Sequence, residues 1–399
     1  MKNGRRVGDA GIIEWAKRVF QWQYIYPLGV FVFLRLWLSV WASVTVAAVP
    51  VHPEGSSMYY GMPPLDSGLD LVVWSPWQRW DTLWYTRIAA QGYSADEGIA
   101  FFPLFPILIR FFAPLVGNNL VAAGMLISSA ATLASFILLY ALTMDLFGVQ
   151  VARNAVLFLA IFPTAFFLFA AYPESLFIAL VLGSFLAMRA SQWQVAGLAG
   201  GLAALSRPQG VLLVLPLLVG FFQQYRQKRV TLAHGASLLL VVAGGLGFVV
   251  YLVVRFQNLF VWFQAQANWR QFALPWEALG RTIGVVLGAR NLSEAIYASP
   301  DLIVAFLFVG LTIWSAFRLD ATLTVYMAIV ILPPLFGITT YERLLPLGSL
   351  SRYALAAFPG FILLAQIPRL VRWRLGIVAI SLVLQTFGLI AFSHWFFMG

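Results

Sequence analysis

The chain has 399 residues, of which 61% are apolar and 10% are charged, and it contains no cysteine. Soluble domains are about 45–50% apolar and about 25% charged, and a soluble fold of this length could not hide so many apolar side chains. Apolar stretches recur to the last residue, which argues against a signal peptide followed by a secreted domain. The lack of cysteine excludes disulfides, thiolate metal sites and cysteine nucleophiles. We therefore expect a polytopic integral membrane protein.

A membrane-spanning helix needs about 20 mostly apolar residues. Eleven apolar segments predict an all-α polytopic bundle that forms a single domain over 1–399: 27–49, 119–146, 151–171, 173–190, 194–206, 209–225, 231–255, 300–317, 321–340, 353–367 and 373–396. The fifth and sixth segments are separated at Ser206-Arg207-Pro208, because proline removes a backbone donor and arginine disfavours lipid. The apolar segment 101–117 carries three prolines and Arg110. It is expected to be a half-buried interfacial piece rather than a span.

The basic residues sort to one side of the predicted membrane. With a cytoplasmic N-terminal segment (1–26), 14 basic and four acidic residues lie inside, whereas 10 basic and 11 acidic residues lie outside. The short inner loops then carry the positive excess. Because this distribution accounts for the net charge of +10, no nucleic-acid partner is indicated. We expect a plasma (inner) membrane protein with two long extracytoplasmic loops, 50–118 and 256–299, and a short one at 341–352.

The first long loop is dense in aromatic and charged residues. Three tryptophans recur at spacings of three and four residues: Trp77, Trp80 and Trp84. This spacing predicts an interfacial helix that turns its tryptophans toward lipid headgroups and holds Asp81 at membrane level. Tyr85 follows Asp81 at i+4, on an adjacent face of the helix. The alternative is a simple aromatic anchor, in which Asp81 only pairs with Arg79 or caps a helix.

Four charged residues lie beside apolar segments, where an unpaired charge costs a few kcal/mol. Glu174 is at a predicted helix N-terminus, where the helix dipole favours an acid, so capping is the alternative to a functional role. Arg207 precedes Pro208-Gln209-Gly210, which indicates backbone shaped around a cavity, although the side chain could extend to the interface instead. Arg352 opens a span on the outer side, with Arg343 nearby. Arginine suits bidentate phosphate contacts, and the alternative is an ordinary interfacial arginine.

Several chemistries have no sequence signature here. The chain lacks a Walker loop, a dinucleotide glycine fingerprint and a His-Glu-x-x-His motif. The histidines are scattered, at His52, His234 and His394, which makes a histidine-built metal site improbable. Asp96-Glu97 is read as a solvated turn, so no metal is expected. Glycines of the fifth segment are expected to permit close helix packing: Gly197, Gly200 and Gly201.

A series of short motifs runs through the chain in a fixed order. The first loop holds Arg79-Trp80-Asp81, Trp84-Tyr85, Ile88-Ala89, Gly92-Tyr93 and Phe101-Phe102-Pro103-Leu104-Phe105-Pro106. Later motifs are Phe162-Pro163, Tyr172-Pro173-Glu174-Ser175-Leu176-Phe177, Ser206-Arg207-Pro208-Gln209-Gly210, Ser351-Arg352-Tyr353 and Phe358-Pro359. Over about 80–360 the sequence resembles the PIG-V family, the GPI mannosyltransferase 2-like enzymes with many bacterial relatives. The first-loop match is specific, whereas the later motifs are short and gain weight from their order.

This resemblance implies a GT-C-type glycosyltransferase, a membrane enzyme that uses a polyprenyl-phosphate sugar at a non-cytoplasmic active site. An acidic residue of the first outer loop is essential in that family, and the matching position is Asp81. Many members carry histidine where this chain has Trp84, which bears on the choice of acceptor. The long lumenal insertions of eukaryotic members are absent, so GPI synthesis is not implied.

The leading hypothesis is inverting transfer of a sugar, with mannose expected, from a polyprenyl-phosphate donor to a lipid or glycan acceptor. Asp81 is the expected general base. The leaving phosphate is expected to bind three arginines: Arg352, Arg207 and Arg343. Substrate contacts are expected from six further residues: Arg79, Trp80, Tyr85, Tyr172, Glu174 and Tyr353.

Beyond these substrates, membrane lipids are expected as partners, a partner subunit stays open, and no cofactor is expected. The alternative from another class is a transporter or lipid flippase, whose broken helices and buried charges look similar, although the chain shows no internal repeat. A non-catalytic membrane subunit is a third possibility, which the several separate charged sites disfavour.

Overall fold

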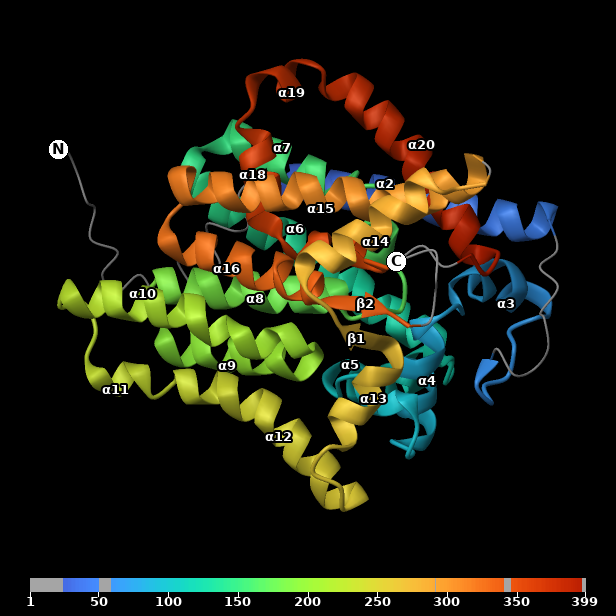
Figure 1. The fold of residues 1–399 in the computed structure, drawn as a ribbon, viewed down its shortest axis with the longest axis horizontal. Coiled ribbons are helices and arrows are strands. Elements are labelled where there is room, and N and C mark those ends of the chain that lie inside the picture. Colours follow the sequence, from blue (N-terminus) through green and yellow to red (C-terminus); the bar gives the residue numbers. More distant parts are fainter. Residues whose placement is uncertain (1–23, 50–58, 291, 341–345, 397–399) are drawn as a thin grey trace.

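The computed structural model describes residues 24–49, 59–290, 292–340 and 346–396. Over these residues the chain is helical apart from its connections and one two-stranded sheet. The long helices lie side by side along one axis, and short helices and strands gather at one end of the bundle (Figure 1). The predicted all-α polytopic architecture is confirmed.

Five helices among the described residues are long and apolar enough to cross a membrane. They are α2 (Ile25–Ala48), α6 (Leu120–Phe147), α11 (Leu232–Gly235) continued by α12 (Leu238–Phe256), α15 (Leu292–Arg318) and α20 (Arg374–Ser393). The other bundle helices are shorter: α7 (Val149–Ala160), α8 (Glu174–Arg189), α9 (Trp193–Ser206), α10 (Val214–Arg226), α16 (Ala321–Ile331), α18 (Phe358–Ala365) and α19 (Pro368–Arg372). The number of spans therefore stays a prediction.

Four of the predicted spans are interrupted at or near a proline, in addition to 231–255, which is divided between α11 and α12. The segment 151–171 leaves α7 after Ala160 and continues as a buried irregular chain that includes η6 (Ala165–Leu168). The others contain η7 (Pro208–Leu213) before α10, η8 (Pro333–Phe336) and β2 (Gly337–Thr339) after α16, and α17 (Leu350–Tyr353) with η9 (Ala354–Ala356) before α18. Proline marks each break, because it lacks a backbone donor and disfavours the helical conformation of the residue before it.

The two long predicted outer loops are built from short elements. The first contains α3 (Gly68–Val73), η3 (Ser75–Trp77), α4 (Asp81–Gln91), η4 (Glu97–Ala100), α5 (Leu104–Phe112) and η5 (Ala113–Val116). The second contains α13 (Val261–Trp269), β1 (Arg270–Phe272), α14 (Pro275–Leu287) and the start of α15. In α5, Phe105 and Ile109 are fully buried while Ile107 and Phe111 are exposed. The half-buried character expected for 101–117 is confirmed.

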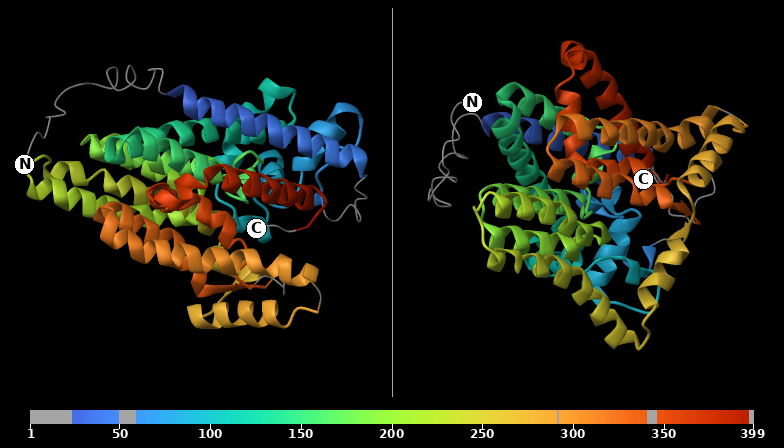
Figure 2. Two further views of the ribbon diagram at one scale, coloured as in Figure 1. Left: turned by 90° about the horizontal axis from the view of Figure 1, so that it is seen from above. Right: turned by 60° about the vertical axis from the view of Figure 1, so that its left-hand side comes forward.

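A two-stranded sheet joins the second outer loop to the segment before α17. Strand β1 pairs antiparallel with β2, and Arg270 lies opposite Thr339. The all-α prediction did not include these three-residue strands. Figure 2 shows that α14 runs along the outside of α15, so that this loop folds back onto the bundle. The sheet forms one side of the bundle end at which the short elements gather.

Glycines hold α9 and α12 in close contact, as predicted. A Cβ atom at Gly197 would lie 2.2 Å from the Ser237 carbonyl oxygen, and one at Gly244 would lie 2.3 Å from the Gly201 carbonyl oxygen. Only a residue without a side chain permits backbones to approach this closely. The contact fixes the position of α9, whose C-terminal end leads directly into Arg207.

Candidate active site

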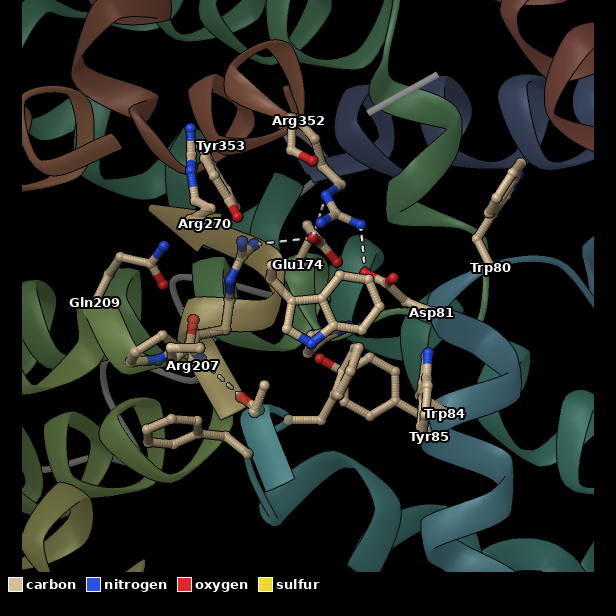
Figure 3. A pocket seen from close by; sticks show the side chains of 18 of the residues that line it. Trp80, Asp81, Trp84, Tyr85, Glu174, Arg207, Gln209, Arg270, Arg352 and Tyr353 are labelled. Carbon is tan, nitrogen blue, oxygen red and sulfur yellow. Dashed lines mark hydrogen bonds and ion pairs between the residues drawn. The ribbon is translucent and has the colours of Figure 1, made fainter. Parts of the chain in front are cut away.

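A cavity of about 160 Å³ lies at the end of the bundle where the short elements gather. One water molecule needs about 10–15 Å³ on this measure, so the cavity accommodates a much larger group. Its walls come from four parts of the chain: the first predicted outer loop, the turns that begin α8 and η7, the second predicted outer loop, and the segment around α17. Figure 3 shows charged side chains from these parts converging on one space.

Asp81 is the first residue of α4 and lines the cavity. The residue before it, Trp80, has a φ of 53°, a conformation that costs a bulky residue about 1–3 kcal/mol and persists only where packing imposes it. The Asp81 backbone N–H donates to the Tyr172 hydroxyl at 3.1 Å. Its Oδ2 accepts a 2.6 Å bond from Arg352 Nη1. The alternative in which Asp81 merely pairs with Arg79 is therefore wrong.

Glu174 joins two of the three arginines of the predicted phosphate site. It begins α8, as its predicted position at a helix N-terminus requires. Its Oε1 lies 3.0 Å from Arg207 Nη1 and 3.4 Å from Arg352 Nε. Because Arg352 also holds Asp81, the four charged groups form one linked chain, drawn with dashed lines in Figure 3.

Three arginines surround the ring of Tyr353. The guanidinium carbons of Arg207, Arg352 and Arg270 lie 5.1, 5.7 and 5.8 Å from the ring centroid. Burial lowers the pKa of Arg352, but Asp81 and then Glu174 outweigh burial and hold that pKa well above its ordinary value. The cavity wall around Tyr353 therefore favours an anion.

Arg270 is a cavity residue that the sequence reasoning missed. It lies on β1, and its Nη2 donates to the Pro334 and Gly337 carbonyl oxygens at 3.1 and 3.4 Å. The sequence signal that could have indicated Arg270 was its place beside Trp269 in a long aromatic loop. No regular spacing in the sequence relates Arg270 to the other charged residues of the cavity. Gln266 and Trp269 also line the cavity without having been singled out, whereas Gln209 belongs to the segment that was predicted to be shaped around a cavity.

The three tryptophans of the first loop do not form the predicted stripe facing the headgroups. Trp77 lies in η3, and the regular helix begins only at Asp81. Trp77 is 1% exposed and Trp84 is 4% exposed, so both pack inside the protein. Trp80 and Trp84 line the cavity instead. The spacing of the three tryptophans fits a helix, but the positive φ at Trp80 interrupts the helical backbone between Trp77 and Trp84.

Arg79 does not line the cavity, contrary to its predicted substrate contact. Its Nε donates to the Ser393 carbonyl oxygen at 2.8 Å, and its Nη1 donates to the Ser75 and Gln78 carbonyl oxygens at 2.6 and 3.0 Å. Burial lowers the pKa of its guanidinium to about 10. Arg79 therefore ties the first outer loop to the end of α20.

The remaining predicted residues are divided between the cavity and its support. Trp80, Tyr85 and Tyr353 line the cavity. Tyr172 is 1% exposed and lies behind the wall, where it supports Asp81. Arg343 lies outside the described residues. Over the described part of the chain, no group of three or more acidic or histidine side chains is arranged to hold a metal ion.

Comparison with known proteins relates this site to one family. Residues 64–298, more than half of the chain, match the mannosyltransferase (PIG-V) family. No curated protein sequence matches the chain significantly. The fold is similar to the crystal structure of ArnT from Cupriavidus metallidurans bound to undecaprenyl phosphate, with a TM-score of 0.50 and 15% identity. The match covers 91% of this chain and 64% of that one, so the chain spans less than two thirds of that protein's length.

Proposed function

Because the chain belongs to the mannosyltransferase (PIG-V) family, we propose that it transfers mannose from a polyprenyl-phosphate donor to a hydroxyl of a lipid or glycan acceptor. Family and fold make it a membrane glycosyltransferase of GT-C-like architecture. The observation that carries the proposal is the cavity in which Asp81 and Glu174 are linked through Arg352 and Arg207. We assign this cavity to the extracytoplasmic side of the plasma membrane, because it lies among the loops that the charge distribution puts there.

A lipid monophosphate suits the charges of the cavity. Guanidinium groups bind phosphate oxygens in pairs of parallel hydrogen bonds, and Arg207, Arg270 and Arg352 converge on one side of the cavity around Tyr353. A donor of this class brings its sugar on a phosphate and needs no nucleotide-binding loop, and no such motif occurs in the sequence. The structurally similar ArnT was crystallised with undecaprenyl phosphate, a ligand of the same chemistry.

Asp81 is the group that we assign as general base. In the proposed step the acceptor hydroxyl gives its proton to the Asp81 carboxylate while its oxygen forms a bond to the sugar C1. The bond between C1 and the phosphate oxygen breaks, and its electron pair leaves with polyprenyl phosphate. One displacement of this kind inverts the configuration at C1. Arg352 and Arg207 stabilise the negative charge that grows on the leaving phosphate.

Because Asp81 is paired with Arg352, binding of the donor phosphate also affects Asp81. A phosphate that binds Arg352 competes with the Asp81 carboxylate for the same guanidinium. Donor binding would then release Asp81 toward the acceptor while Glu174 keeps its contact with Arg207. This sequence of events favours donor binding before acceptor activation. No observation on the cavity favours transport or lipid flipping, and the family match favours sugar transfer.

The proposal is tested with detergent-purified protein and defined lipid-linked sugars. Polyprenyl-phosphate-mannose and polyprenyl-phosphate-glucose are each incubated with a membrane lipid extract as the acceptor source. We expect the mannosyl lipid to be consumed, and polyprenyl phosphate and a new mannosylated product to be formed in equimolar amounts. Mannosyl lipid that is recovered intact, under conditions where the protein stays monodisperse, would overturn the proposal. Use of the glucosyl lipid alone would retain glycosyl transfer and exclude mannose.

A further inference from the structure

A further acid lies buried beside the cavity, in α15. Asp301 is 5% exposed and belongs to Ser299–Arg318, the part of α15 that is long and apolar enough to cross a membrane. A carboxylate that is buried at the end of such a span is unfavourable unless it is compensated, which makes it a candidate for function. Its Oδ1 accepts a 2.8 Å hydrogen bond from the backbone N–H of Ser351. Asp301 does not itself line the cavity.

Ser351 is held from both sides of its backbone. Its N–H donates to Asp301, and its carbonyl oxygen accepts a 2.9 Å hydrogen bond from the Thr164 hydroxyl. All three residues are buried. The next residue in the chain is Arg352, so these two side chains, from α15 and from the turn before η6, fix the peptide groups that carry its guanidinium.

The short helix α17 needs such external support. It comprises only four residues, and its N-cap residue, Ser349, has a φ of 71°. One helical turn fixes many backbone angles for few hydrogen bonds and is unstable by itself. The contacts to Ser351 therefore determine where the α17 side chains point, including Arg352 and the ring of Tyr353.

We propose that Asp301 is a positioning residue, which fixes α17 through Ser351 and so aims Arg352 at the donor phosphate. The identity of that phosphate rests on the proposed function. Asp301 is also within electrostatic reach of Arg270 and Arg352, so a purely electrostatic role is the competing explanation. The two roles separate on substitution, because asparagine keeps an oxygen that accepts the Ser351 N–H but carries no charge.

The first measurement is independent of any ligand. Hydrogen exchange of the lipid-free protein is compared for wild type, Asp301→Ala, Asp301→Asn and the control Thr312→Val. Thr312 is buried in the same helix, and its hydroxyl donates to the Phe308 carbonyl oxygen of that helix. We expect faster exchange across 346–357 in Asp301→Ala alone. Unchanged exchange there, or faster exchange throughout the bundle, would overturn the positioning role.

The second measurement compares undecaprenyl phosphate with undecaprenol, which has the same chain without the phosphate. We expect wild type, Asp301→Asn and Thr312→Val to bind undecaprenyl phosphate at least about tenfold more tightly than undecaprenol. Asp301→Ala is expected to bind undecaprenyl phosphate about tenfold more weakly than wild type does. If Asp301→Asn binds as weakly as Asp301→Ala, charge rather than the hydrogen bond is responsible, and the proposal fails. If wild type does not distinguish the two lipids, the proposed donor fails, while the exchange measurement still decides the positioning role.

Discussion

Asp81 and Glu174, the two acids that line the cavity, differ in how accessible their carboxylates are. The Asp81 side chain is 16% exposed, whereas that of Glu174 is 2% exposed and touches two arginines. A base must come within hydrogen-bond distance of the proton that it removes, so Asp81 is the accessible acid. Removing one member of a buried ion pair leaves an uncompensated charge and costs about 3–5 kcal/mol. Loss of the Glu174 charge is therefore expected to harm folding, which makes Asp81 the cleaner probe of catalysis.

Asp81→Asn is expected to lower the rate of sugar transfer by about 10²–10⁴-fold, the usual contribution of a general base. The amide keeps the shape of the side chain and can still accept a bond from Arg352, but it cannot take the acceptor proton. The rate is measured with detergent-purified enzyme and polyprenyl-phosphate-mannose, at equal monodispersity.

Asp70→Asn is the matched control for this change. Asp70 lies in α3 of the same predicted loop, is exposed and does not line the cavity. It is expected to transfer sugar at the wild-type rate. Wild-type activity of Asp81→Asn would remove Asp81 from the chemistry and leave its ion pair as a structural contact.

Arg352→Lys is expected to weaken the use of the donor by at least about tenfold. Lysine keeps the positive charge but lacks the planar fork, which here spans Asp81 and Glu174 through different nitrogens. The KM for the lipid-linked donor is the measured quantity. Arg318→Lys is the control, because Arg318 is exposed at the far end of α15. Equal effects of the two substitutions would assign Arg352 an anchoring role only.

The charges of the site were predictable individually, but their pairing was not. Glu174, Arg207 and Arg352 stand out in the sequence because burial of each is costly. The contact between Arg352 and Asp81 joins residues 271 positions apart, and no local pattern encodes such a distance. Asp301 was overlooked because it resembles the polar end of an apolar segment until the Ser351 hydrogen bond is seen.

At the scale of single elements, proline explains both the errors and the site. Hydropathy predicts 151–171 as one span, but α7 ends at Ala160, and the buried chain that follows passes Pro163 and Pro173 before α8 begins. Apolar composition measures burial and does not distinguish helix from irregular chain. The break delivers Glu174 to the cavity wall and Tyr172 to a position behind it, because non-helical backbone at membrane depth is tolerated where protein encloses it.

Gly244→Ala is expected to lower the thermal stability of the protein in detergent. A Cβ there would lie 2.3 Å from a backbone oxygen of α9, and overpacking of this kind costs about 1–3 kcal/mol. Gly247→Ala in the same helix is the control, since a Cβ there meets no atom within 4 Å. Alanine favours a helix over glycine by about 0.5–1 kcal/mol, so the control should be neutral or stabilising. A wild-type melting temperature for Gly244→Ala would show that α9 and α12 can separate at little cost.

Across the whole molecule, the cavity and the basic connections lie at opposite ends of the bundle. Arg189, the last residue of α8, pairs with Asp145 near the end of α6 and with Asp320 just before α16, and all three were predicted to be cytoplasmic. The turn between α10 and α11 lies at that same end, while α4, α13 and the sheet lie at the other (Figure 1). The sequence predicted this separation because charge sorting depends only on the order of the loops. Which loops approach one another to form the cavity required the three-dimensional structure.

The last prediction concerns which end of the bundle faces the cytoplasm. Because the predicted topology puts 14 basic residues on one side of the membrane, a reporter fused after Arg229 should read as cytoplasmic, and one inserted within 60–75 should read as extracytoplasmic. Alkaline phosphatase and a fluorescent protein that matures only in the cytoplasm give complementary signals at each position. Opposite readings at both positions would move the cavity to the cytoplasmic face. The proposed reaction would then have to draw its lipid-linked donor from the inner leaflet, and the assignment of the two long loops would be wrong with it.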